Sequence, residues 1–229
     1  MKQNKFDIVF HTPAFLGDAQ QSGCWRTPPF KAQLRQWWRV VYWAKHHTNF
    51  SLETMRQAEG QLFGNAWLKD DFQKSQVRMR LNHWRKGTLE QKDWEPGAQV
   101  VHPEVSKPID SQLYLGFGPV TNKTGIKANA AIQAGESAKL IMAYPEKDAE
   151  DIEQALQLMH FYGTVGGRSR NSWGSYSCLA VNPSEQTLAL PVSKDWENCL
   201  NQDWPHAIGK DHNGPLGTSD QLPHLPATN

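Results

Sequence analysis

The sequence is poor in cysteine, with three among 229 residues. Cys24, Cys178 and Cys199 are widely spaced and include no C-x-x-C pair, which argues against a disulfide framework or a zinc site. The nine histidines contain no H-E-x-x-H or similar ligand spacing, so we expect no bound metal and no cofactor. Unpaired cysteines are typical of a reducing compartment, and we therefore expect a cytoplasmic protein.

Long apolar runs are also absent. No stretch of about 18 apolar residues occurs, so we expect no segment that spans a membrane. Residues 1–5 lead into a short strand-like run rather than into the long apolar core of a secretion signal. The 38% hydrophobic and 21% charged residues are instead typical of a globular protein with a sizeable core.

The net charge of +1 hides an uneven distribution. Residues 1–50 contain seven Lys or Arg against two acidic residues, and the remainder of the chain is mildly acidic. A local basic surface of this kind is suited to the phosphate backbone of a nucleic acid. The alternative is an ordinary solvated face, and charge alone does not separate the two.

Hydrophobic periodicity and turn residues predict alternating strands and helices. Strands are expected over residues 6–11, 77–83, 113–120, 137–144 and 176–181, and helices over 29–47, 52–67 and 146–163. Proline and glycine interrupt residues 85–109, which we interpret as an inserted loop region. The order predicts an α+β, ferredoxin-like (RRM-like) βαββαβ domain over residues 1–182. Residues 183–229 would be an irregular C-terminal extension or a truncated linker to a second half.

The helix expected over residues 29–47 has two distinct faces. Its apolar stripe consists of residues that recur at helical spacing: Phe30, Leu34, Trp37 and Val41. Lys31, Arg35 and Arg39 follow one another at intervals of four on another face, and Trp38 is expected at the margin of that face. Three cations at this spacing repel one another and would gain from a polyanion along the helix. The alternative is that they pair with acidic residues elsewhere in the fold.

Residues 163–174 (GTVGGRSRNSWG) form a glycine-rich basic loop between the last predicted helix and the last strand. Glycines let backbone N–H groups approach an anionic chain closely, and Arg168 and Arg170 are suited to bind phosphates. The loop follows a helix rather than preceding one and lacks G-K-[ST], so it is not a P-loop. The alternative is a flexible turn with solvated arginines.

Ten tryptophans are many for a chain of this length. Each ring removes a large apolar area from water, so we expect most of them in the core or at interfaces. One or two are candidates for platforms on which nucleobases stack.

Three stretches together resemble a known family: residues 12–17 (TPAFLG), 28–39 (PPFKAQLRQWWR) and 166–174 (GGRSRNSWG). The resemblance is to the RAMP superfamily of CRISPR effectors, and most of all to the N-terminal half of the first RAMP subunit of the type III-B (Cmr) complex. It covers roughly residues 6–181, and the R-x-W-W-R helix with its matching glycine loop is quite specific. The usual subunit has a second ferredoxin-like half.

The resemblance implies a non-catalytic subunit of a type III CRISPR antiviral ribonucleoprotein complex. Its partners would be the crRNA guide, the target RNA and other RAMP or Cas subunits. The RNA-binding candidates are Arg26, Lys31, Arg35, Arg39, Gly166, Gly167, Arg168, Ser169, Arg170 and Asn171, and all of them except Arg26 lie in the segments that resemble the family. A second hypothesis is a RAMP-type endoribonuclease for guide maturation or target cleavage, and a third is a scaffold that binds only neighbouring proteins.

Related backbone subunits carry an aspartate just before the first helix, where this chain has residues 23–27 (GCWRT) and no acid. The nearest carboxylate is Asp18, which we interpret as a turn residue rather than a catalyst. His46, His47 and His160 are the candidates for the general acid and base of a metal-independent ribonuclease. Each of them is near a predicted helix end, where surface histidines are common, so we expect that the chain is not an enzyme.

Overall fold

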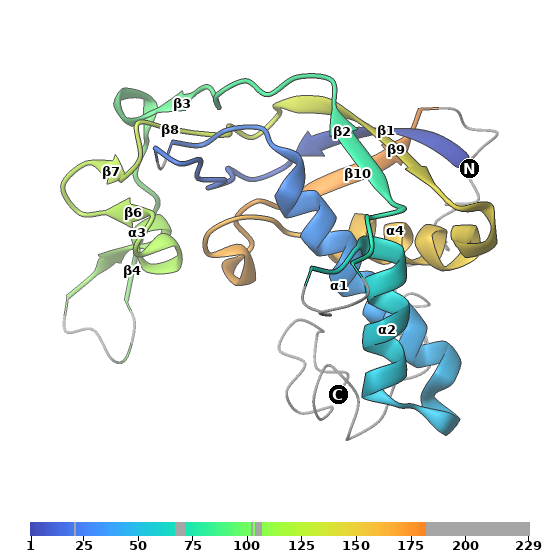
Figure 1. Ribbon diagram of the computed structural model, residues 1–229. Coiled ribbons are helices and arrows are strands. Elements are labelled where there is room, and N and C mark those ends of the chain that lie inside the picture. Colours follow the sequence, from blue (N-terminus) through green and yellow to red (C-terminus); the bar gives the residue numbers. More distant parts are fainter. Residues whose placement is uncertain (21, 67–71, 102, 104–106, 182–229) are drawn as a thin grey trace.

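The computed structural model describes residues 1–181, apart from residues 21, 67–71, 102 and 104–106. The C-terminal extension expected over residues 183–229 lies outside the described residues. The described chain consists of a four-stranded sheet, helices against one face of it, and a lobe of short elements at one side (Figure 1). The α+β class predicted from the sequence is confirmed.

The strands of the main sheet lie in the order β10-β1-β9-β2, and each pairs antiparallel with its neighbours. Their bounds are Lys2–Phe10 (β1), Arg78–Leu81 (β2), Ser137–Tyr144 (β9) and Tyr176–Ala180 (β10). Helices α1 (Thr27–His46) and α2 (Leu52–Phe63) connect β1 to β2, and α4 (Ala149–Tyr162) connects β9 to β10. Short 3-10 turns follow α1 (His47–Asn49) and precede α4 (Glu146–Asp148). The sequence predicted all of these strands and α-helices.

The core lies between the sheet and helices α1 and α4. Its side chains come from β1 and β9 (Phe6, Ile8, Leu140, Met142), from α1 (Phe30, Leu34) and from α4 (Ile152, Leu156), and none of them reaches solvent. Each contributes about 1.5–3 kcal/mol by leaving water. The alternate residues of the strands, among them Lys5, Arg78 and Lys139, are exposed on the opposite face of the sheet.

Helix α1 buries a slightly different face from the predicted one. Trp38 is only 3% exposed, whereas Trp37, which was expected in the apolar stripe, is partly buried at the edge of the core. The reason is the second helix, because Phe63 of α2 meets the Trp38 ring with 5.7 Å between ring centroids. The periodicity of α1 alone does not predict which of its side chains contact a neighbouring helix.

The lobe is formed by residues between β2 and β9. Its elements are β3 (Leu89–Glu90), a 3-10 turn (Gln91–Asp93), β4 (Gln99–Val100), β5 (Ile109–Asp110), α3 (Ser111–Gly116), β6 (Val120–Thr121), β7 (Gly125–Ile126) and β8 (Ala130–Ala131). The strand predicted over residues 113–120 is wrong, because this segment begins in helix α3 and continues as a turn. The Asp110 carboxylate accepts a hydrogen bond from the Leu113 N–H at 2.6 Å and caps the helix.

Tryptophan contributes mainly to the interior. Trp25, Trp38, Trp43 and Trp173 are each 7% exposed or less. Trp84 is the contrast, with 69% of its surface exposed between β2 and the lobe. These four tryptophans are core residues, as we expected for most of the tryptophans.

Candidate nucleic-acid interface

The glycine-rich loop, residues 163–174, lies against residues 12–17, which follow β1. The Gly167 N–H donates to the Phe15 carbonyl at 3.1 Å, and the Gly174 N–H donates to the Pro13 carbonyl at 2.8 Å. The Thr12 hydroxyl donates to the Ser172 carbonyl at 2.6 Å. Two of the three stretches on which the family resemblance rests are therefore one structural unit.

Four residues of the loop adopt left-handed backbone conformations. Gly166 and Gly174 have φ of 100° and 68°, and Arg168 and Ser172 have φ of 58° and 68°. A non-glycine residue in this region costs about 1–2 kcal/mol, so it persists only where the surrounding contacts fix it. The loop therefore has a defined shape, with a 3-10 turn (Ser169–Asn171) between the two strained non-glycine residues.

The loop also binds the lobe through two side chains. The Arg168 Nε donates to the Phe117 carbonyl at 2.6 Å, and the Asn171 amide donates to the Leu115 carbonyl at 2.7 Å. Arg170 is exposed and makes no hydrogen bond or ion pair with any described residue. Gly167 and Ser169, which precede Arg170 in the sequence, are half-buried. The loop thus presents one guanidinium that is partly engaged and one that is available to an anion.

The three cations of α1 have a different environment. A single carboxylate, Glu59 of α2, is 3% exposed and pairs with both Arg35 and Arg39, the latter at 2.7 Å. The alternative considered from the sequence, pairing with an acid elsewhere in the fold, therefore describes these two arginines. One carboxylate against three cations leaves the face positive, and each guanidinium side chain is still about one third exposed (34% and 36%).

Lys31 is the third cation of this face and has a neutral partner. Its ammonium donates to the Ser75 hydroxyl at 2.7 Å. Burial lowers the pKa of Lys31, and the neighbouring Arg35 charge lowers it further. A cavity of about 530 Å³ opens beside Lys31 and Arg35, and the rest of its lining is mainly apolar and includes Phe63 and Met79.

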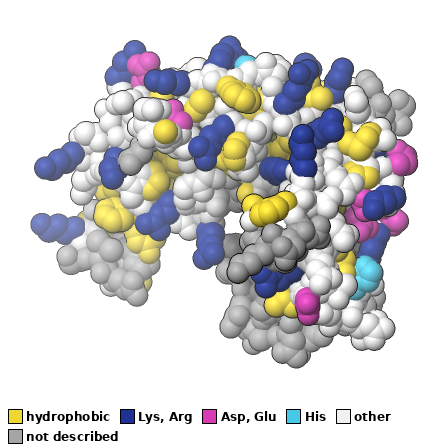
Figure 2. All heavy atoms as spheres, in the orientation of Figure 1, with side chains coloured by type: hydrophobic (Ala, Val, Ile, Leu, Met, Phe, Trp, Pro, Cys, Tyr) yellow, Lys and Arg dark blue, Asp and Glu magenta, His cyan; other side chains and the backbone are white. Residues whose placement is uncertain are grey.

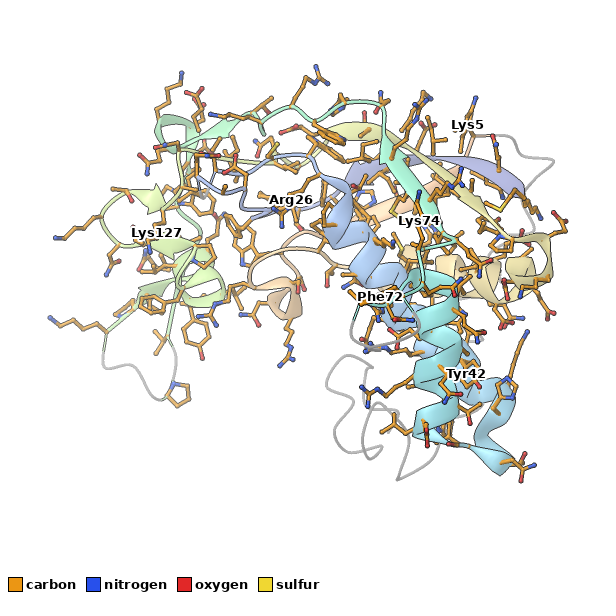
Figure 3. All side chains as sticks on the ribbon, in the orientation of Figure 1. Lys5, Arg26, Tyr42, Phe72, Lys74 and Lys127 are labelled. Carbon is orange, nitrogen blue, oxygen red and sulfur yellow. The ribbon has the colours of Figure 1, made fainter. Side chains whose placement is uncertain are left out.

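Arg26 lies just before α1, near the middle of the face shown in Figure 3. Its Nε is buried and has no hydrogen-bond partner among the described residues. The backbone around it is fixed, because the Trp25 N–H donates to the Arg85 carbonyl at 2.9 Å. Because solvent does not reach the Nε, a phosphate would contact the outer guanidinium nitrogens of this half-buried side chain.

The candidate catalytic residues do not converge. The Asp18 carboxylate accepts the N–H groups of Gln20 and Ser22, each at 2.9 Å, which is the geometry of a turn residue. His46 is exposed at the end of α1, and His47 begins the following 3-10 turn. The His160 Nδ1 accepts the Cys178 N–H at 2.9 Å, and burial lowers the pKa of His160. Within the described ranges no group of three metal-ligating side chains occurs.

Sequence reasoning missed the contribution of the lobe. A cavity of about 340 Å³ lies where the lobe meets the glycine-rich loop, and its lining includes Phe15, Gly118, Lys127 and Gly167. The missed signal was the run of residues 116–119 (GFGP), whose glycines and proline indicate a turn rather than the strand predicted there.

Charge is distributed unevenly over the molecular surface. Figure 2 shows Lys and Arg side chains across the visible face, over the lobe as well as over the sheet and helices, with Asp and Glu fewer and mainly toward the margins of the view. A face of this kind is suited to a polyanion. In the part of the chain that the structure describes, no helix is long and apolar enough to cross a bilayer.

Comparison with known proteins gives one family and several structures. The model of the RAMP superfamily matches residues 7–177. Cmr1 from Pyrococcus furiosus, in its apo form, is similar with a TM-score of 0.50 and 17% identity over 80% of this chain. A chain of a type IV-B CRISPR complex matches with a TM-score of 0.46 and 14% identity, covering 88% of this chain and all of its own length.

A third similar structure is a type III-B Cmr-beta complex bound to cognate target RNA, with a TM-score of 0.37 and 12% identity over 77% of this chain and 58% of that one. No curated protein matches the sequence. The chain spans about half of the Pyrococcus furiosus Cmr1 chain, 51% of its length.

Proposed function

Because the chain belongs to the RAMP superfamily of CRISPR effectors, we propose that it is a non-catalytic guide-RNA-binding subunit of a type III CRISPR ribonucleoprotein complex. The sheet order β10-β1-β9-β2 and the helical connections between its strands support a ferredoxin-like, RRM-like βαββαβ unit. The described cysteines, Cys24 and Cys178, are free thiols, in keeping with a cytoplasmic complex. Other RAMP or Cas subunits would be its protein partners.

The observation that carries the proposal is the preorganised glycine-rich loop. Its backbone is fixed by Phe15 and Pro13, and Arg170 extends from it with no described partner. A guanidinium held on a rigid loop binds a phosphate without losing much conformational freedom. The α1 face should contribute less to RNA affinity than the loop, because Glu59 already offsets part of the charge of Arg35 and Arg39.

The experiment that tests the proposal compares two exposed arginines. Arg170 lies on the loop, and Arg78 lies on the open face of the sheet. R170A should weaken the binding of guide-length RNA roughly tenfold at about 0.1 M salt and lower the slope of log K against log salt by about 1. R78A removes the same charge and should change the affinity less than about twofold. Equal effects of the two changes would mean that RNA contacts the protein through charge alone, without the loop.

RNA that co-purifies with the protein from its native host provides a second test. Repeat-derived guides of uniform 5′ end should be recovered with the wild-type chain and in smaller amount with R170A. Random RNA, or none, would favour the scaffold hypothesis.

The proposed lack of catalysis is supported by the local roles of the candidate residues. Asp18 accepts two backbone N–H groups of its own turn, and His160 accepts the Cys178 N–H. Target-RNA cleavage by a complex that contains D18N or H160Q should therefore proceed at the wild-type rate. A loss of cleavage in either complex, with RNA binding and melting temperature unchanged, would restore the endoribonuclease hypothesis.

A further inference from the structure

The turn after α3 presents an exposed phenyl ring. Phe117 is 65% exposed, directly after the helix ends at Gly116. Gly118 follows with φ of 111°, and its N–H donates to the Val120 carbonyl at 3.2 Å, which closes the turn. A large apolar side chain at the tip of a tight turn loses contact with the core, so it has no evident role in folding.

The backbone beneath this ring is held by the glycine-rich loop. Arg168 donates to the carbonyl of Phe117 itself, and Asn171 donates to the carbonyl of Leu115. Helix α3 packs closely on the loop, because a Cβ on Gly116 would lie 3.3 Å from the Trp173 indole nitrogen. The ring is therefore placed on a rigid base, and a ligand that stacks on it does not need to order the turn first.

The surroundings of the ring are cationic and concave. Arg168 donates to the Phe117 carbonyl of the turn, and the Lys127 N–H donates to the Pro119 carbonyl at 2.7 Å, so both cationic residues are tied to the turn. Lys127 is exposed, and Figure 3 shows it on the lobe. The cavity of about 340 Å³ that Gly118, Pro119 and Lys127 line opens next to the turn. An exposed ring on a turn that is tied to two cationic residues, Arg168 and Lys127, matches a ligand with alternating planar apolar groups and negative charges, which is the chemistry of a single RNA strand.

We propose that Phe117 stacks on a nucleobase of a single-stranded segment of the bound RNA, with Arg168 and Lys127 on the phosphates that flank that base. This inference rests on the proposed function and names the part of the molecule that contacts bases rather than backbone. Stacking of this kind tolerates any base, because every base has a π-face. A protein partner would instead have to bury both cations against its own surface.

The test measures the affinity of the full chain for fluorescently labelled single-stranded RNA, with Phe72 as a matched control. Phe72 is 72% exposed and lies on another part of the face, near α1 and α2 (Figure 3). F117A should weaken binding roughly tenfold without changing the salt slope, F117W should restore it, and F72A should have little effect. With an RNA of the same length that contains abasic sites, wild-type and F117A proteins should bind equally.

The outcomes separate this inference from the proposed function. If R170A weakens binding but F117A does not, or if F72A weakens it as much as F117A, the stacking role is wrong and the proposed function stands. If the wild-type chain does not bind RNA, the proposed function itself fails. If F117A keeps its RNA affinity but loses a co-purifying subunit, the ring contacts a protein and the inference is overturned. Melting temperatures of all variants should lie close to the wild-type value, because both rings are exposed.

Discussion

The basic face of α1 and the glycine-rich loop have similar charge in the sequence, but they differ in what already holds their cations. On α1, Arg35 and Arg39 share the buried carboxylate of Glu59. On the loop, Arg168 donates to a neutral backbone carbonyl, and Arg170 has no partner among the described residues. A guanidinium bound to a carbonyl keeps its full charge, whereas two guanidinium groups that share one carboxylate have their charge partly offset. The loop is thus the stronger candidate for phosphate binding, although it has fewer cations.

Two carboxylates of different kinds stabilise α1 and its connection to the lobe. Glu59 is buried and offset by two positive charges. Glu136, just before β9, joins the lobe to the start of α1 through neutral donors: the Trp25 indole, the Thr88 N–H and hydroxyl, and the Gln133 N–H. Removal of either carboxylate should destabilise the fold, but only the loss of Glu59 frees cations for RNA.

The largest expected effect is on the loop, from G174A. Gly174 has φ of 68°, and a Cβ there would lie 1.9 Å from the Val165 carbonyl oxygen, so both the backbone conformation and the packing oppose a side chain. We expect a loss of about 3 kcal/mol or more in the free energy of unfolding, together with a loss of RNA affinity. Thermal unfolding and RNA titration measure the two effects.

The control for G174A is G135A. Gly135 has φ of 86° but no atom within 4 Å of the position of a Cβ, so this change tests the conformational cost alone, about 1–2 kcal/mol. RNA affinity should be unchanged. If G135A destabilised the protein as much as G174A, the close approach of residues 165 and 174 would not matter, and the loop would be less rigid than its contacts indicate.

Local patterns predicted the strands and helices of the main sheet and its connections but not the short elements of the lobe, and long-range contacts determine what they missed. The spacing of Phe30 and Leu34 predicted α1, and alternation predicted β9, because each pattern is set by neighbours in the same element. Glu59 lies 24 residues from Arg35, and Phe117 lies 51 residues from Arg168, so nothing local specified either pairing. The loop could therefore be predicted as a basic segment, but not as the support of an exposed ring.

The second prediction concerns the α1 face and tests E59Q. A glutamine of the same shape keeps one acceptor for Arg35 and Arg39 but removes the charge that offsets them. Because both arginines are about one third exposed, water compensates in part, and we expect a loss of about 2 kcal/mol in the free energy of unfolding. RNA affinity should stay the same or rise, since the face becomes more positive.

Glu53 on the same helix provides the matched control, because it is exposed and the described structure shows no ion pair for it. E53Q should change stability by no more than about 0.5 kcal/mol. A fall in RNA affinity in E59Q, with the protein still folded, would contradict the proposed difference between the regions: the Glu59 pair would then be positioning the arginines for RNA.

The smallest expected effect distinguishes the two carboxylates by pH. Burial alone would raise the pKa of Glu136, but the hydrogen bonds from Gln133, Thr88 and Trp25 together hold that pKa below its ordinary value of 4.5. A carboxyl group with a lowered folded-state pKa stabilises the fold fully above 4.5 and loses this contribution as the pH falls through the lower, folded-state pKa. E136Q should therefore lower the free energy of unfolding by about 1 kcal/mol at neutral pH and by progressively less below about pH 4, because the wild-type protein loses the contribution of the carboxylate there.

Urea unfolding of the wild-type, E136Q and E95Q proteins from pH 3 to pH 7 measures this difference, and Glu95 is an exposed control on the same lobe. A difference between wild type and E136Q that stayed constant over this range would mean that the carboxylate charge contributes nothing, and that Glu136 joins the lobe to α1 by shape alone.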